Sequence, residues 1–247
     1  MAAPYIGTSG WSYDHWHGPF YPAGLPPGGR LGHYAGRLGS VEIDNTFYKL
    51  PDADTLVKWR ETVPPGFVFA TKASRYITHM KKLKDPGDNV PGFVARMDAL
   101  GEQLGPILFQ LPPRWHRNTE RLGAFLDTLE ARHRWAFELR DRSWIDAAVL
   151  ALLTAHNAAF CIYELDGYLS PAEVTADFVY IRLHGPDGAY RGNYDAAALD
   201  HWAGAVSDWL AEGLDVYCYF DNDEKGYAAH NARALAERLT QRLVGTG

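Results

Sequence analysis

Cysteine is scarce in this chain of 247 residues, which contains only two. Two cysteines are too few for a disulfide-rich secreted scaffold or a cysteine-based metal centre. Both of them, Cys161 and Cys218, fall within predicted strands. We expect two buried thiols, and a single disulfide is the alternative.

Long hydrophobic runs and an excess of positive charge are also missing. No segment approaches the roughly 20 apolar residues of a membrane span. The first ten residues, MAAPYIGTSG, lack a basic start and an apolar run, so we do not expect a signal peptide there. The chain has 24 basic and 30 acidic side chains, a net charge of −6, which argues against tight non-specific nucleic-acid binding. We expect a soluble, cytoplasmic protein without a membrane partner, and the oligomeric state stays open.

What the chain does have is a regular alternation of strand-like and helix-like segments. The strand-like runs are residues 5–11, 40–47, 67–73, 106–112, 135–141, 159–165, 178–185 and 215–222. Amphipathic segments of helical period are residues 52–63, 90–104, 118–132, 146–156, 196–213 and 226–243. This alternation predicts an α/β fold, a TIM-like (β/α)8 barrel formed by one domain over residues 1–247.

Two details of the alternation refine the fold class. Residues 165–177 are too few for a full helix and two loops, so we expect a short or irregular sixth crossover. An open doubly wound sheet is the rival fold, but no GxGxxG sequence follows the first strand.

Polar side chains alternate with aliphatic ones along several of these strands. In FVYIRLHG (178–185), Tyr180, Arg182 and His184 share one face, and a strand of a barrel points that face to the interior. The same rule places these further side chains inside: Glu42, Asp44, Lys72, Gln110, Glu138, Arg140, Glu164, Tyr219 and Asp221. The interior is therefore predicted to be polar.

Several of these side chains lie at the carboxyl ends of their strands, where barrel enzymes carry their chemistry. We predict that His184, Glu138 and Glu42 transfer protons. The cations Lys72, Arg140 and Arg182, with Gln110, are predicted to bind an anionic group such as a phosphate or carboxylate.

Two other uses of these residues stay open. The glutamates and cations could simply neutralise one another in a structural ion-pair network, because an unpaired buried charge is costly. A divalent metal is the second alternative, although His184 is the single strand-end histidine and the cations would repel the ion. HWH (15–17) could add ligands from the first loop. No cofactor is predicted.

Aromatic residues are frequent in the loops that follow the strands. Most of them are expected to pack the loops, but Trp11 and Trp144 lie nearest to strand ends, and we predict that they contact the ligand. The run RYITHMKKLK (75–84) is a candidate basic patch, although a solvated loop explains it more simply.

Seven motifs together resemble the DUF72 (YecE-like) family. They are TSGWSYDHWHGPFYP (8–22), VEIDNTFYKLP (41–51), FATKASRYITH (69–79), QLPPRW (110–115), FELRDRSW (137–144), YIRLHG (180–185) and YFDNDEKGYAAHNA (219–232). The resemblance implies a TIM-barrel-like fold, and the family has no established activity. Asn222 is one of the family's motif residues, and we predict that it contributes to substrate binding; Asp44 and Asp221 stand where the family more often shows Asn.

Three functional readings follow. The first is an acid–base enzyme (hydrolase, isomerase or lyase type) that acts on a polar anionic substrate such as a sugar phosphate or phosphate ester. The second is a nucleic-acid or nucleotide binding protein of endonuclease-like barrel type, in which Arg75, Lys81, Lys82 and Lys84 meet phosphates. The third is a barrel that acts only through partner proteins.

Overall fold

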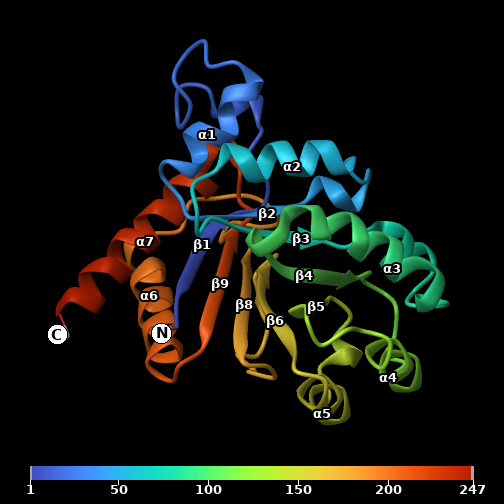
Figure 1. Cartoon of the computed structure of the whole chain (residues 1–247). Coiled ribbons are helices and arrows are strands. Elements are labelled where there is room, and N and C mark those ends of the chain that lie inside the picture. The colour runs from blue at the N-terminus through green and yellow to red at the C-terminus, as the bar shows by residue number, and fades with distance from the viewer. Residues whose placement is uncertain (1, 246–247) are drawn as a thin grey trace. The chain divides into compact units, whose positions relative to one another are not determined.

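The structure is a computed structural model that describes residues 2–245. The chain, drawn in Figure 1, divides into two compact units. The terminal unit comprises Met1–Glu42, Ile162–Pro171 and Phe178–Gly247, and the central unit comprises Ile43–Cys161 and Ala172–Asp177. Strand β6 (Ala158–Leu165) contributes its first half to the central unit and its second half to the terminal unit.

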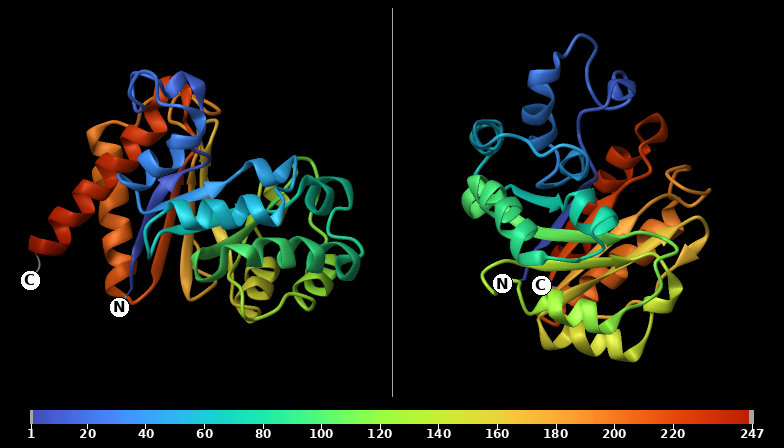
Figure 2. Two further views of the ribbon diagram at one scale, coloured as in Figure 1. Left: turned by 45° about the horizontal axis from the view of Figure 1, so that its top comes forward. Right: turned by 90° about the vertical axis from the view of Figure 1, so that its right-hand side faces the viewer.

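The terminal unit is built on three parallel strands. Strand β9 (Asp215–Phe220) lies between β1 (Pro4–Thr8) and β8 (Phe178–Leu183) and pairs in parallel with both. Helices α6 (Ala196–Ala211) and α7 (Tyr227–Gly245) lie side by side and pack against this sheet, as Figures 1 and 2 show. The remaining elements of this unit are η1 (Asp14–Trp16), η2 (Pro27–Gly29), α1 (Arg30–Ala35), the start of β2 (Ser40–Ile43), β7 (Tyr168–Leu169) and η7 (Glu224–Gly226).

The central unit repeats the strand–helix alternation. Its strands β3 (Val68–Lys72), β4 (Leu104–Leu111), β5 (Trp135–Leu139) and the first half of β6 are parallel neighbours. Its helices are α2 (Ala53–Thr62), α3 (Pro86–Met97), α4 (Thr119–Leu126) and α5 (Ala147–Ala155). Short helices η3 (Asn45–Phe47), η5 (Asp98–Gln103) and η6 (Arg142–Trp144) and a π-helix, η4 (Tyr76–Met80), complete it.

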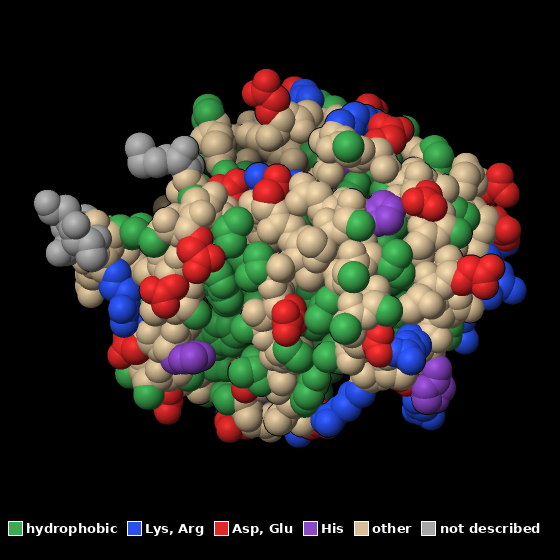
Figure 3. All heavy atoms as spheres, turned by 90° about the horizontal axis from the view of Figure 1, so that it is seen from below, with side chains coloured by type: hydrophobic (Ala, Val, Ile, Leu, Met, Phe, Trp, Pro, Cys, Tyr) green, Lys and Arg blue, Asp and Glu red, His purple; other side chains and the backbone are tan. Residues whose placement is uncertain are grey.

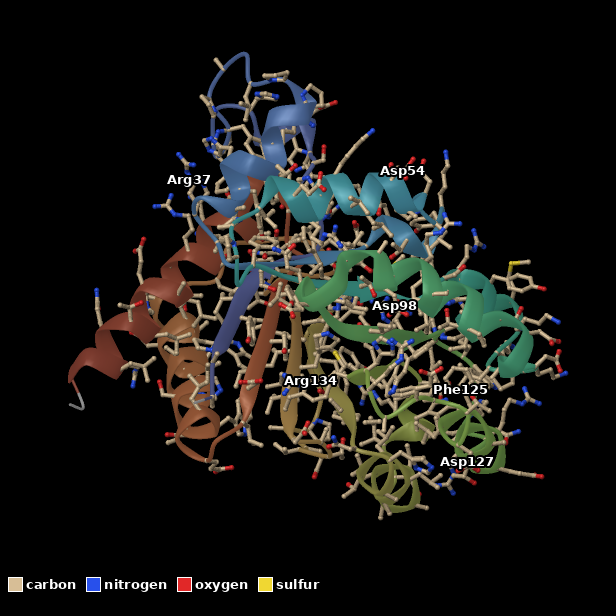
Figure 4. All side chains as sticks on the ribbon, viewed as in Figure 1. Arg37, Asp54, Asp98, Phe125, Asp127 and Arg134 are labelled. Carbon is tan, nitrogen blue, oxygen red and sulfur yellow. The ribbon has the colours of Figure 1, made fainter. Side chains whose placement is uncertain are left out.

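Aromatic packing holds the sheet of the central unit against its helices. Phe109 of β4 stacks on Phe137 of β5, with ring centroids 5.3 Å apart. Phe125, labelled on α4 in Figure 4, meets the ring of Phe109 edge-on at 5.0 Å. All three rings are fully buried, and burying a side chain of this size contributes about 1.5–3 kcal/mol.

Side-chain caps explain where several helices begin. The Asp52 carboxylate accepts a hydrogen bond from the Thr55 amide at the start of α2, and Asn118 Oδ1 accepts one from the Arg121 amide at the start of α4. Each cap satisfies one of the amides that a helix leaves unpaired in its first turn.

The predicted fold class is confirmed. All eight predicted strands are present, and their order in the sheet, β1-β9-β8-β6-β5-β4-β3-β2, follows the chain, as in an α/β TIM-like barrel. The short sixth crossover is confirmed too, because between β6 and β8 the chain forms only β7, antiparallel to β6, and no helix. The expectation of one domain stays a prediction.

Three local features differ from the sequence prediction. Helix α1 was not predicted, because its six residues lie in a segment rich in glycine and proline. The predicted helix over 90–104 starts at Pro86, ends at Met97 and is followed by η5, inside which Gly101 has a non-helical backbone with φ of 59°. The run 75–84 is not a solvated loop throughout, because Ile77, Thr78 and Leu83 are buried.

Cys161 in β6 and Cys218 in β9 are buried thiols that are not joined in a disulfide, as the sequence indicated. Across residues 2–245, no helix has both the length and the apolar character that a bilayer crossing requires.

Candidate functional site

A buried ion pair lies within the terminal unit. Glu42 of β2 and Arg182 of β8 are 0% and 1% exposed, and Arg182 donates to both carboxylate oxygens of Glu42 at 2.8–3.2 Å. The hydroxyls of Ser9 and Tyr180 each donate to the same carboxylate at 2.6 Å. Glu42 therefore has the strong hydrogen-bonding that a buried carboxylate requires.

Tyr180 is held in its neutral form by this arrangement. Burial and the adjacent Glu42 carboxylate raise the pKa of Tyr180 well above its usual value. Its hydroxyl therefore remains a hydrogen-bond donor to Glu42 at any physiological pH.

The Arg182 guanidinium also connects to side chains that follow the ends of β8 and β9. Arg182 Nη2 donates to Asp221 Oδ2 at 3.0 Å, and His184 Nδ1 lies 3.0 Å from the same oxygen. His184 is fully buried, whereas the side chain of Asp221 is 15% exposed. Of these three side chains, Asp221 is the one that reaches solvent.

A second cluster lies in the central unit, at the carboxyl ends of three adjacent strands. Lys72 is the last residue of β3, and Gln110 of β4 pairs in register with Glu138 of β5. Arg140 follows β5 and donates to Glu138 Oε1 at 2.5 Å. Glu138 is fully buried and the Arg140 side chain is 14% exposed, so the guanidinium lies on the solvent side of the carboxylate.

An aromatic ring organises the basic side chains of this cluster. The Lys72 ammonium lies 4.4 Å from the ring centroid of Phe47, and the imidazole of His79 packs edge-on against the same ring at 4.9 Å. Thr46 fixes the approach of η3 to β3, because its hydroxyl donates to the Lys72 carbonyl at 2.6 Å. We call Phe47, Lys72, His79, Glu138 and Arg140 the cationic cluster.

The pKa of His79 in the cationic cluster is low, because of burial first and of neighbouring positive charges second. Partial burial, the largest cause, and the positive charges of Lys72, Arg140 and Arg75 together lower this pKa to about 4, although the carboxylate of Glu138 raises it. The cations therefore outweigh the anion, and His79 is neutral near pH 7. Sequence reasoning overlooked His79, although it ends the motif FATKASRYITH (69–79) and that position was the available signal.

Four other side chains that were predicted to bind a ligand are buried. Trp144 is fully buried, and its indole N–H donates to the Trp115 carbonyl at 2.5 Å. Trp11 is 8% exposed, and Gln110 is 4% exposed with its amide donating to the Leu111 carbonyl at 3.2 Å. Asn222 is buried and donates to the Gly192 carbonyl. Binding roles for these four stay predictions.

The predicted site residues thus divide between the two units. The terminal unit contains Trp11, Glu42, Arg182, His184 and Asn222, and the central unit contains Lys72, Gln110, Glu138, Arg140 and Trp144. Within residues 2–245, no three His, Cys, Asp or Glu side chains are grouped so that they could hold a metal ion.

Comparisons with known proteins place the chain in a family. The family described as "Protein of unknown function DUF72" matches residues 5–246. The UPF0759 protein YecE of Escherichia coli (strain K12) is 31% identical over 137 residues, which are 55% of this chain and 48% of YecE, so the match spans about half of that relative. The UPF0759 protein YunF of Bacillus subtilis (strain 168) is 25% identical over 95% of this chain and 94% of its own.

A solved structure agrees in fold over nearly the whole chain. The crystal structure of a DUF72 family protein from Thermotoga maritima superposes with a TM-score of 0.87 and 27% identity, covering 96% of this chain and 99% of that one. The match over residues 5–246 shows that the chain belongs to the DUF72 family. The order of the strands and the seven motifs agree with this assignment.

Proposed function

We propose that this protein is an acid–base enzyme that acts on a polar substrate carrying a phosphate or carboxylate, which Lys72 and Arg140 bind. The observation that carries the proposal is the grouping of two cations, Lys72 and Arg140, with a single buried carboxylate, Glu138, at the ends of β3 and β5. Their positive charges add to burial in lowering the pKa of His79. The position of the cationic cluster supports the proposal as well, because the C-terminal strand ends carry the active sites of barrel enzymes.

Binding of an anion would activate His79 as a base. In the free protein the imidazole has a pKa of about 4, too low for efficient proton abstraction at pH 7. A phosphate bound between Lys72 and Arg140 offsets their charges and raises the pKa of His79 towards neutrality. Proton acceptance is then coupled to occupancy of the anion site, which suits hydrolysis, isomerisation or elimination without a redox cofactor.

The proposal changes the roles assigned from sequence. Glu138 becomes the partner that orients Arg140, because it is fully buried behind the guanidinium. Glu42 becomes the partner of Arg182, since Ser9 and Tyr180 also donate to it. His184, likewise fully buried, becomes a residue that holds Asp221 in place.

Nucleic-acid binding is less well supported. In the run 75–84, Lys81 lies 3.2 Å from Asp85 Oδ2, so part of its charge is already neutralised. Figure 3 shows one face of the molecule, on which Lys and Arg side chains are scattered singly among acidic and hydrophobic ones. No observation favours nucleic-acid binding over an enzymatic function. A cytoplasmic location is also part of what we propose.

The test is turnover of phosphate esters and sugar phosphates in D2O. Proton and phosphorus NMR would follow pooled compounds incubated with the wild-type protein, and we expect deuterium incorporation, isomerisation or phosphate release. Lys72→Met and His79→Asn should abolish it, whereas Lys58→Met on the exposed surface of α2 should not. Turnover that survives in both cluster variants would refute the proposed site.

A further inference from the structure

A pocket lies in the terminal unit, formed by the loops that follow β1, β8 and β9. Its volume is about 650 Å³, within the range of small-molecule sites. The polar and aromatic side chains that line it include His15, His17, Tyr190, Arg191, Asp223 and Lys225. We call it the Tyr190 pocket, and none of its lining residues belongs to the cationic cluster.

The backbone that forms this pocket is unusual. Tyr190 and Lys225 both have left-handed conformations, with φ of 65° and 57°, which non-glycine residues seldom adopt. Left-handed residues of this kind gather at ligand sites and active sites, where the surrounding structure stabilises a strained backbone. Two of them in one pocket favour a binding function over a connecting role for these loops.

Tight loop packing holds Tyr190 in position. The Tyr190 amide donates to the His184 carbonyl at 2.6 Å, and its ring meets the buried His184 ring edge-on at 5.4 Å. Gly185 has φ of 112°, and a Cβ there would lie 2.1 Å from the Arg191 carbonyl oxygen. Asn222 joins this loop to the one after β9 by its hydrogen bond to the Gly192 carbonyl at 2.8 Å. The tyrosine is thus pre-positioned, yet it is 41% exposed.

The polar groups of the pocket are balanced in charge. Arg191 and Lys225 oppose Asp223 and Glu224. His15 Nε2 lies 2.7 Å from the Asp223 carbonyl oxygen and 3.3 Å from its carboxylate. Burial and the nearby Asp221 raise the pKa of Asp223, so this carboxyl is poorly solvated and gains from a hydroxyl donor.

This combination identifies a ligand class. A phosphate would call for an excess of cations, which the pocket does not have. An exposed aromatic face accepts the C–H groups of a sugar ring, and carboxylates, imidazoles and basic side chains together satisfy hydroxyls as donors and acceptors. We propose that the Tyr190 pocket binds an uncharged sugar, with one ring stacked on Tyr190 and hydroxyls donating to Asp223.

The experiment is saturation-transfer NMR with glucose, galactose, mannose and N-acetylglucosamine as probes, followed by calorimetric titration of any sugar that binds. We expect transfer to the ring protons of at least one sugar. Tyr190→Asn should weaken binding at least tenfold, and asparagine tolerates the left-handed backbone, so the loop should keep its fold. Tyr190→Phe should retain binding, and Asp223→Asn should weaken it.

The matched control is Tyr168→Ala, which removes a tyrosine of β7 outside the pocket and should leave binding unchanged. The proposal is overturned if none of the four sugars shows transfer, or if Tyr190→Asn binds as tightly as the wild type. It is also overturned if a sugar phosphate competes at Tyr190 more strongly than the uncharged sugar. Because these variants leave Lys72 and His79 intact, failure here is distinguishable from failure of the proposed enzyme function.

Discussion

Replacing Arg182 with glutamine should reveal how strongly the buried ion pair shapes the terminal unit. In the wild type, Glu42 is fully buried and accepts hydrogen bonds from Arg182, Ser9 and Tyr180. In Arg182→Gln, the carboxylate retains the two hydroxyl donors and loses its countercharge. Removing one partner of a buried pair leaves an uncompensated charge, which costs about 3–5 kcal/mol.

Replacing the partner instead, in Glu42→Gln, should lower the free energy of unfolding by less than Arg182→Gln does. In Glu42→Gln the arginine keeps Asp221 at 3.0 Å as a carboxylate partner, so its charge remains compensated. The double variant, Arg182→Gln with Glu42→Gln, has no isolated charge at the centre and should be more stable than Arg182→Gln alone. A loss of about 3–5 kcal/mol corresponds to a fall in Tm of roughly 6–20 °C for a chain of this length.

Urea unfolding followed by tryptophan fluorescence and circular dichroism would measure these differences, with unchanged m-values confirming a common unfolding reaction. Equal costs for the two single variants would refute the reasoning. So would a double variant whose cost is the sum of the two, because coupled charges must not be additive.

Two further substitutions test the site and its supporting loop. The pKa of His79 is about 4 in the folded state and near 6.5 in the unfolded chain, so the unfolded chain binds more protons between these values. Stability should therefore fall as the pH drops from about 6.5 to 4, by about 1–2 kcal/mol after discounting for solvent exposure, and His79→Gln should remove that part of the pH dependence in urea titrations. Gly185→Ala should lower the free energy of unfolding by at least about 2 kcal/mol, because its Cβ would collide with the Arg191 carbonyl in a left-handed backbone, and an unchanged Tm would contradict this.

The sequence predicts the fold well because its signals are local. Strand β8 alternates polar and aliphatic residues with a period of two, and this pattern also placed Tyr180 and Arg182 on the face that meets Glu42. The short sixth crossover followed from counting residues. Helix α1 escaped because six residues carry too little periodicity to distinguish a helix from a loop.

The site was harder to predict because it depends on contacts between distant segments. The strand pattern predicted that Glu42 points to the interior. It could not predict that Ser9, Tyr180 and Arg182 would together donate hydrogen bonds to its carboxylate. It could not show that Trp144 is buried against Trp115, nor that a π-helix brings His79 to the Phe47 ring. These facts arise from side-chain packing, to which a pattern of hydrophobic residues is insensitive.

The most direct test of the account is an NMR titration of the His79 imidazole, assigned by comparison with His79→Gln, without and with inorganic phosphate. We predict a pKa of about 4 in the free protein, rising towards neutrality when phosphate is present, and no such rise in Lys72→Met. A free-protein pKa near 6.5 would show that the cations do not dominate the cationic cluster. A pKa that phosphate leaves unchanged would contradict an anion site there.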